Sequence, residues 1–349
     1  MGSMKEPLEN HRSLGKRIRR VACWAVAGAV VAVGGLGAFA YMRLDSNLKS
    51  IDIGDALGKD RPKDYNNGSQ DILVLGSDSR SGANKDLAGG DTGGTARADT
   101  AMVVHVPAGQ KKASVVSIPR DTLVTRPECT TKSGKQVPAA NRVMFNSIYG
   151  TGGPACVVKT IEQHTGIRMD HFIEIDFAGF KRLIDALGGI TISIDKPIHD
   201  KSSGLELQAG THRLDGSQSL AFVRTRHGIG DGSDLGRIEL QQKFILALLS
   251  EVERQNLLTS PAKLFLLADS ATRSLTTDSQ LSSLVSLMNF GKSLKHLGPA
   301  TTELITLPVV ADTADPNRVV PALPQAEELW KALKADQPIP ASAKTKKRG

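Results

Sequence analysis

Several familiar catalytic motifs are missing from this sequence. It contains neither HExxH nor GxSxG, which argues against a zincin protease and against an α/β-hydrolase. The glycine-rich stretch GGDTGG does not match GxxxxGK[ST], and no helix is predicted after it, which argues against a nucleotide P-loop. Self-similarity at a period of roughly 20–50 residues is also missing, which excludes a repeat architecture.

The central part of the chain lacks a surplus of charge. The formal net charge is +8, but residues 1–20 carry six Lys/Arg against two Glu, and the last six residues carry four Lys/Arg and no acid. These two ends account for the whole surplus. A basic face for nucleic acid is therefore not predicted, and an anion site in the body must arise from local clustering.

Charge is also missing from 22 consecutive residues, Val21–Met42. As a helix this run reaches ~33 Å, enough for a hydrocarbon core of about 30 Å. A cleaved signal peptide is the alternative, but its apolar stretch is usually shorter. The basic segment GKRIRR precedes the run, and only Arg43 and Lys49 follow closely. We therefore predict a single-pass cell-membrane protein with a cytoplasmic N-terminus and residues 43–349 outside the cytoplasm.

Only three cysteines are present. Cys23 lies in the predicted span as a small apolar residue. Cys129 and Cys156 lie in the exported part and lack a CxxC partner or a nearby His pair, so a metal site is disfavoured. We predict a structural disulfide between them, a bond that typically stabilises by about 2–4 kcal/mol.

Short β-branched runs alternate with amphipathic helical patterns from residue 71 onward. This order is typical of an α/β fold with a layered sheet flanked by helices. The predicted organisation has five parts: a cytoplasmic basic tail (1–20), a transmembrane helix (21–42), a stalk (43–70), a catalytic domain (71–310), and a C-terminal helix with a disordered basic tail (311–349).

Asp and Arg gather in four places at the ends of the predicted elements. Strand ends and loops are where an α/β sheet presents functional groups. The four clusters are Gly76–Arg80, Arg97–Thr100, Pro119–Asp121, and a block with Arg224, Arg226, His227, Asp231, Asp234, Arg237 and Gln241.

The last cluster has informative spacing. On an extended chain Arg224 and Arg226 would point to one side, and Arg237 and Gln241 share a helix face. Guanidinium groups hold phosphate oxygens in pairs. Asp78 and Asp99 could bind Mg²⁺ against the same anion, which gives the usual groups for phosphoryl transfer.

Structural explanations remain open for each of these residues. A single Arg–Asp pair is more often a surface ion pair than a site. Asp234 can cap the helix that follows it, and Asp78 can shape a turn. His105 is predicted to be a core histidine, and His227 is a weaker candidate for a ligand contact.

Taken in order, five segments resemble the LytR–CpsA–Psr family of cell-wall glycopolymer ligases, over about residues 70–250. They are DILVLGSDSR, RADTAMVVHV, VVSIPRDT, FIEIDFAGFKRLIDALGGITISID, and LDGSQSLAFVRTRH running into DLGRIELQQ. Two features depart from the family pattern: the loop between Asp78 and Asp99 is long, and Leu240 stands where many relatives have a basic residue.

The resemblance implies an apolar pocket for a prenyl tail and a role for each cluster. Asp78 and Asp99 would hold Mg²⁺, Arg120 would act at the transferred phosphate, and Asp121 or Asp234 would assist deprotonation. The implied pyrophosphate contacts are Arg80, Arg97, Arg120, Arg224, Arg226, Arg237 and Gln241.

The implied reaction transfers a glycopolymer from a polyprenyl-pyrophosphate-linked donor to a peptidoglycan hydroxyl. Two alternatives stay open: a polyprenyl-pyrophosphate pyrophosphatase, with water as the acceptor, and a non-catalytic envelope binder or regulator. The carboxylates of the predicted Mg²⁺ site count against a pure binder, because anion binding alone does not need them.

Overall fold

The computed structural model describes residues 34–64, 68–78, 97–109, 112–131, 133–226, 234–255 and 260–344. The chain forms two compact units, residues 1–47 and 48–349. In the first unit, residues 34–47 are helical. Within the described ranges no helix is both long and apolar enough to cross a membrane. Residues 21–33 of the predicted span lie outside those ranges, so the span stays a prediction.

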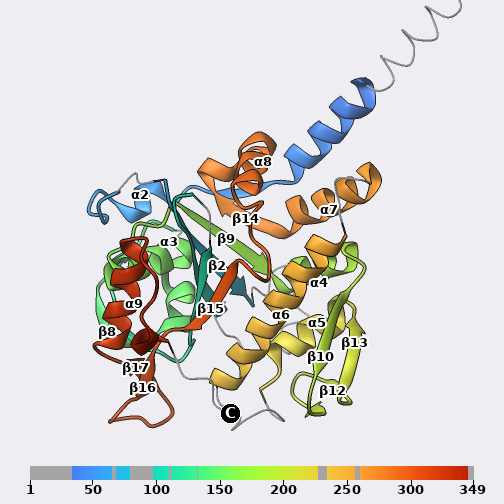
Figure 1. The fold of residues 1–349 in the computed structure, drawn as a ribbon. Coiled ribbons are helices and arrows are strands. Elements are labelled where there is room, and N and C mark those ends of the chain that lie inside the picture. The colour runs from blue at the N-terminus through green and yellow to red at the C-terminus, as the bar shows by residue number, and fades with distance from the viewer. Residues whose placement is uncertain are drawn as a thin grey trace, which may run out of the picture. The chain divides into compact units, whose positions relative to one another are not determined.

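A seven-stranded mixed sheet forms the centre of the second unit (Figure 1). Its inner strand β2 (Gln70–Ser77) pairs antiparallel with β3 (Ala98–Val106) and parallel with β9 (His171–Asp176). The full order is β1 (Lys49–Ile51), β14 (Leu275–Asp278), β9, β2, β3, β4 (Ala113–Ile118) and β15 (Thr302–Thr306).

One face of this sheet is fully covered. Alternate residues of β2 and β3, such as Leu73, Leu75 and Val103, are 0% exposed and belong to the largest apolar cluster. That cluster also takes in the helices α2 (Gly54–Leu57), α3 (Phe145–Thr165) and α9 (Gln325–Lys334). The two-residue period of the strands directs these side chains toward the helices.

The opposite face carries a smaller cluster, in which Ile72 and Val106 pack with Leu281 and Phe290. Leu281 belongs to the short 3₁₀ helix η3 (Ser279–Leu281), and Phe290 to α8 (Leu284–Ser293). A separate apolar cluster joins α4 (Phe177–Ala186), α5 (Gly216–Arg224) and α6 (Asp234–Arg254) to a hairpin of β10 (Ile190–Ile194) and β13 (Gly210–Leu214). A second hairpin, β11 (Ile198–Asp200) and β12 (Leu205–Leu207), belongs to the same cluster. The predicted α/β fold with helices on a central sheet is confirmed.

Segments outside the predicted catalytic domain are also folded onto the sheet. Part of the expected stalk forms β1 and α2, because Ile53 and Leu57 are buried in the main cluster. Within 311–349, β17 (Val319–Pro321) pairs with β16 (Val309–Ala311), and α9 buries Leu329 and Trp330. α7 (Pro261–Ser274) leads directly into β14.

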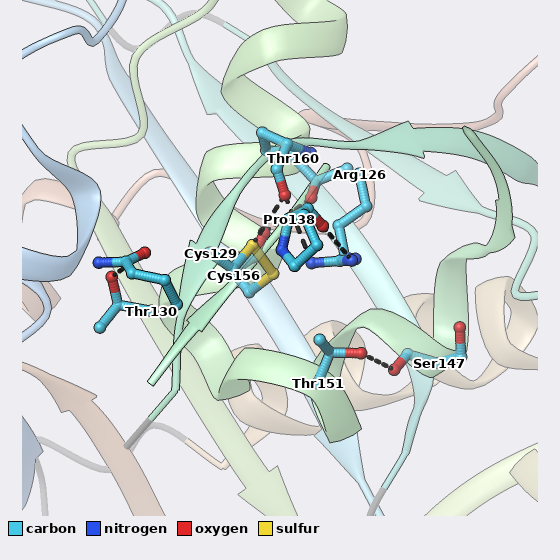
Figure 2. The surroundings of a disulfide bond; sticks show 10 residues. Arg126, Cys129, Thr130, Pro138, Ser147, Thr151, Cys156 and Thr160 are labelled. Atoms are coloured by element: carbon cyan, nitrogen blue, oxygen red, sulfur yellow. Dashed lines mark hydrogen bonds between the residues drawn. A yellow bond between two sulfur atoms is a disulfide. The ribbon is translucent and has the colours of Figure 1, made fainter. Parts of the chain in front are cut away.

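The predicted disulfide is confirmed. Cys129 and Cys156 are bonded, with their Cα atoms 5.4 Å apart (Figure 2). The bond links α3 to β6 (Cys129–Thr130), which pairs with β7 (Gln136–Val137); a neighbouring hairpin consists of β5 (Leu123–Arg126) and β8 (Ala140–Met144). Arg126 donates to the carbonyl of Pro138 at 2.7 Å and Thr160 to that of Cys156 at 2.7 Å. The bond therefore sits in a hydrogen-bonded, buried setting.

Candidate active site

A β-bulge displays Asp99 at the start of β3. Gly76 pairs with Thr100 but the next residue, Ser77, pairs with Ala98, so Asp99 is an extra residue in the ladder. Bulges redirect side chains and occur often beside active sites. Asp99 is 27% exposed and points its carboxylate at Arg120.

Arg120 is surrounded by three carboxylates. It follows β4, and its Nη1 donates to Asp99 at 3.0 Å, while its Nε lies 3.6 Å from Asp121 and 3.5 Å from Asp234. Its backbone N–H also donates to Asp234 at 3.0 Å. The side chain is 15% exposed. Segments far apart in the sequence thus hold one guanidinium in place.

Arg237 is the most deeply buried cation of the group, at 4% exposure. It lies on the first turn of α6, forms an ion pair with Asp234, and donates from Nη2 to the carbonyl of Asp99 at 3.3 Å. Burial, opposed by the charge of Asp234 and reinforced by that of Arg120, lowers the pKa of Arg237 to about 10. The group therefore stays positively charged at neutral pH.

Gln241 lies one turn further along α6. Its amide donates to the hydroxyl of Thr100 and to the carbonyl of Val223, each at 3.1 Å. It therefore links α6 to both β3 and α5. The predicted pairing of Arg237 and Gln241 on one helix face is consistent with these contacts.

Arg226 lies near this group, and Arg224 differs from expectation. The backbone N–H of Arg226 donates to Asp200 at 2.8 Å, and burial followed by repulsion from Arg120 lowers the pKa of its side chain. The two arginines do not share an extended strand: Arg224 ends α5, and its guanidinium lies over the ring of Phe177, 4.7 Å from the centroid. The capped helix continues to Arg224, which overrides the two-residue spacing argument.

Asp78 and Arg97 close the open end of the β2–β3 pair. The N–H of Asp78 donates to the carbonyl of Arg97 at 3.1 Å, and the N–H of Arg97 donates to the Asp78 carboxylate. Arg97 is exposed. Arg80, His227 and Asp231 lie outside the described residues.

A buried hydrogen-bond network holds the C-terminal end of β2 in place. Glu174 accepts from the Ser77 hydroxyl at 2.6 Å and from the Tyr149 hydroxyl at 2.7 Å. Burial, then the charge of Glu174, raises the pKa of Tyr149, so the phenol stays neutral. The network fixes β2 just before Asp78.

The carboxylates at this end fit a magnesium ion in type and number. Mg²⁺ binds through one or two protein carboxylates together with waters and substrate phosphate oxygens. Asp78 and Asp99 stand at neighbouring strand ends and supply two. Among the described residues no group of three or more His, Cys, Asp or Glu is placed to hold a metal. A site here would therefore depend on the substrate's own oxygens.

The charges of the central group balance one another. Arg120, Arg226 and Arg237 face Asp99, Asp121 and Asp234. The Nε–H groups of Arg120 and Arg237 are buried without a hydrogen-bond partner, as is Oδ1 of Asp234. A buried donor without an acceptor costs free energy, which an anionic oxygen would relieve. This arrangement favours anion binding.

An apolar surface adjoins the group on the α6 side of the sheet. Val74, Met102, Val104 and Ile173 occupy neighbouring register positions and are only partly buried, and all but Met102 pack against the smaller cluster that contains Phe290 of α8. The same strands bury Leu73 and Val103 completely on their other face. A cavity of about 240 Å³, lined by Asp71, His105 and Asp170, lies at the opposite end of β2, away from these groups.

Two contacting residues, Asp200 and Arg318, had not been predicted, and Thr100 had been named only as the end of a cluster. Thr100 holds Gln241, and Asp200 holds the backbone of Arg226. Arg318, just before β17, places Nη1 4.0 Å from Asp121 and has its neighbour Val319 hydrogen-bonded to the Asp121 carbonyl at 3.4 Å. Thr100 stands beside Asp99 in the sequence, but no sequence signal marks Asp200 or Arg318.

Comparison with known proteins matches residues 40–335 to the model of the LytR_cpsA_psr family. The chain belongs to this family. The LytR–CpsA–Psr match covers the sheet, the bulge, the arginine group and α9, and so includes every described site residue.

Among curated relatives of the LytR–CpsA–Psr chain, the cell wall biosynthesis protein LcpA of Corynebacterium glutamicum is 30% identical over 331 residues, 87% of this chain and 62% of LcpA. The chain thus spans less than two thirds of that relative. The polyisoprenyl-teichoic acid–peptidoglycan teichoic acid transferase TagT of Bacillus subtilis is 29% identical, covering 83% of this chain and 88% of TagT. The LytR-Csp2A-Psr enzyme structure from Actinomyces oris superposes with a TM-score of 0.59 at 24% identity, over 82% of this chain and 96% of that one.

Proposed function

We propose that this protein transfers a glycopolymer from a polyprenyl-pyrophosphate-linked donor to a peptidoglycan hydroxyl, leaving a phosphodiester. The observation that carries the proposal is Arg120, held among Asp99, Asp121 and Asp234 beside buried Arg237. Family membership and the name of TagT, a teichoic acid transferase acting on peptidoglycan, support the same reaction class.

The proposed donor would contact two neighbouring regions of the domain. Its prenyl chain is apolar and would lie over Val74, Met102 and Ile173, the partly exposed side of the sheet. Its pyrophosphate would lie at Arg120, Arg226 and Arg237, with Gln241 beside them and Arg97 and Arg224 toward the periphery. Hydrophobic and anionic parts of one molecule would thus meet adjacent regions of matching chemistry.

In the proposed reaction, the acceptor oxygen attacks the phosphorus that bears the sugar. The bond from this phosphorus to the oxygen of the prenyl phosphate breaks, and prenyl phosphate leaves. Arg120 would stabilise the equatorial oxygens, which gain charge in the transition state, and Arg237 would add a fixed positive charge behind it.

The acceptor's proton needs a carboxylate. Asp234 is engaged by Arg237 and by both the backbone and the side chain of Arg120, which makes it a positioning group. Asp121 is 24% exposed and contacts Arg120 and Arg318 only at 3.6 and 4.0 Å. We therefore assign proton acceptance to Asp121.

We include magnesium in the proposal because of the charge balance of the site. Because the three arginines are balanced by three aspartates, a doubly charged pyrophosphate diester needs a further cation. When bound by Asp78 and Asp99, Mg²⁺ would supply that charge and polarise the phosphate oxygens.

The test is transfer by the purified full-length protein. It would be incubated in detergent with a radiolabelled lipid-linked sugar pyrophosphate, Mg²⁺ and peptidoglycan oligomers. Label on the glycan strand is the expected result. Free sugar phosphate formed at the same rate without acceptor would instead identify a pyrophosphatase, and binding without any turnover would identify a binder or regulator.

A further inference from the structure

The β16–β17 turn, residues 312–318, is built around one buried carboxylate. Asp312 is 5% exposed and receives two hydrogen bonds from the guanidinium of Arg142. It also accepts two backbone N–H groups of the turn, at 3.0 and 2.8 Å. Its own N–H donates to the carbonyl of Arg318 at 2.9 Å, and the N–H of Arg318 donates to that of Asp315 at 2.9 Å. These bonds fix the backbone from which the side chain of Arg318 extends.

The end of this turn is attached to the loop that carries Arg120. The N–H of Val319 donates to the carbonyl of Asp121 at 3.4 Å. Val319 also forms a parallel bridge with Thr122, which is 0% exposed. A segment that lies outside the predicted catalytic domain therefore contacts the loop of the candidate site directly, and it brings Arg318 with it.

The carboxylate of Asp121 lies between two guanidinium groups. Its Oδ2 is 3.6 Å from Nε of Arg120, and its Oδ1 is 4.0 Å from Nη1 of Arg318. Both distances are too long for a hydrogen bond. Nη1 of Arg318 donates instead to the carbonyl of Asn317 at 3.1 Å, and its Nε lies 3.8 Å from Asp315. The two oxygens are thus attracted by different cations, and neither is hydrogen-bonded to a guanidinium.

This separation keeps a donor of Arg120 available. The atom that faces Asp121 is Nε, whose N–H has no hydrogen-bond partner among the described residues. Because Coulomb attraction grows as two charges approach, Asp121 would close on this N–H if Arg120 were the nearest cation to both of its oxygens. The carboxylate would then occupy the donor that the proposed pyrophosphate needs. A permanently charged group at the other oxygen opposes that movement, and Arg318 supplies it.

We propose that Arg318 is a positioning residue for Asp121. Its charge holds the carboxylate away from Arg120, so that Asp121 remains a proton acceptor and Arg120 remains a donor to phosphate oxygens. The inference rests on the proposed function and on the assignment of proton acceptance to Asp121. The side chains of Arg318 and Asp121 are 31% and 24% exposed, and ion pairs of this kind contribute little to stability. The role of Arg318 is therefore separable from folding.

The experiment measures transfer by full-length protein with a radiolabelled lipid-linked sugar pyrophosphate, Mg²⁺ and peptidoglycan oligomers. Arg318→Gln should lower kcat by roughly tenfold and leave the KM of both substrates unchanged, a part of the about 10²–10⁴-fold that a general base contributes. Arg318→Lys should retain most of the wild-type kcat, because the contact with Asp121 needs a charge and not a guanidinium fork. Arg273→Gln is the matched control, since Arg273 is 43% exposed and pairs with Asp269 of its own helix.

A double-mutant cycle separates positioning of Asp121 from support of the turn. In an Asp121→Asn background, Arg318→Gln should cause no further loss of kcat, because the group through which it acts has gone. A purely structural role would give the same fold-loss in both backgrounds. The comparison of glutamine with lysine at position 318 does not depend on this background.

Four outcomes would overturn the role of Arg318. They are a wild-type kcat in Arg318→Gln, equal losses in Arg318→Gln and Arg318→Lys, a raised KM with unchanged kcat, and additive losses with Asp121→Asn. The raised KM would mean that Arg318 contacts a substrate. Any of the four, in a wild type that transfers label, removes this role and leaves the proposed function in place, whereas a wild type without transfer removes both.

Discussion

Arg120 contacts carboxylates contributed by β3, by its own loop and by α6, so its position depends on all three. A guanidinium can keep several of these contacts at once because its donors form a planar fork, whereas an ammonium is a single charged point. The guanidinium group of Arg120 is therefore more important for these contacts than its positive charge alone.

We predict that Arg120→Lys lowers the rate of transfer by about 10²–10³-fold, a typical effect of losing a transition-state donor. The folded domain should remain, since a cation is kept among the three aspartates. Arg142→Lys is the matched control, because Arg142 is an exposed arginine that forms a bidentate pair with a different carboxylate, the buried Asp312. Comparable losses in the two variants would contradict the assigned role.

Asp99→Asn tests the metal contribution. Removing this carboxylate should raise the Mg²⁺ concentration needed for half-maximal transfer by roughly tenfold, a usual result of losing one metal ligand or its support. The measurement is a Mg²⁺ titration of transfer, after chelator treatment that should abolish wild-type turnover. An unchanged titration curve would place the cation elsewhere. Thr125→Val, a substitution at a half-buried strand position that removes a hydrogen bond to Asn141, is a suitable control.

The sequence predicted which residues lie in the candidate site better than it predicted how they are arranged. Arg120, Arg237 and Gln241 were all found from motif and helix spacing. Asp99 was named for its chemistry, but the bulge that aims it arises from strand pairing across a long loop, which local patterns do not specify. Arg318 was missed because its contact to Asp121 forms only in the folded state.

At the scale of elements, a buried histidine joins three segments. His105 on β3 lies between Asp71 on β2, at 2.8 Å from Nδ1, and Asp336 just after α9, at 3.0 Å from Nε2. The core position was predicted, while the two carboxylates were not. They convert an expected packing residue into a charged link between the sheet and the C-terminal helix.

This link predicts a pH-dependent stability. Burial lowers the pKa of His105, but the hydrogen bond and charge of Asp71, together with Asp336, outweigh it and leave the pKa raised. The stabilisation is therefore complete below the ordinary histidine pKa of about 6.5 and is lost as the pH rises through the raised value. Urea unfolding of residues 48–349 should show a lower free energy at pH 9 than at pH 6.

His105→Gln should flatten that pH dependence while it lowers stability at pH 6. His199→Gln is the control, since His199 is 57% exposed and pairs only with an exposed glutamate. If the wild type and His105→Gln lose the same free energy between pH 6 and pH 9, the link does not titrate as described.

The disulfide is a second link between elements, and it stabilises the fold. Cys129→Ser with Cys156→Ser should lower the free energy of unfolding by about 2–4 kcal/mol, because the bond restrains the unfolded chain. Calorimetry in the absence of reductant measures the effect, and adding reductant to the wild type should reproduce it. Transfer by the folded variant should be preserved, since the bond joins α3 and β6 rather than the arginine group.

For the molecule as a whole, the membrane topology is a prediction that rests on residues 1–42. The asymmetric basic charge predicts that alkaline phosphatase fused to Gly349 is active and that the same enzyme fused to Met1 is inactive. Changing Arg17, Arg19 and Arg20 to glutamate should reduce the activity of the C-terminal fusion. Equal activity of both wild-type fusions would contradict the orientation.

The distance along the chain between Arg120 and Asp234 has a kinetic consequence. These residues are 114 positions apart and hydrogen-bonded, and part of the intervening segment, with α4 and α5, forms a separate apolar cluster together with α6. Contacts of such long sequence separation slow folding, because chain closure must precede the gain from the contact. We expect the helical cluster to form early and the arginine group to assemble late. Ligand binding during refolding would then report completion of the domain, well after most helical signal has returned.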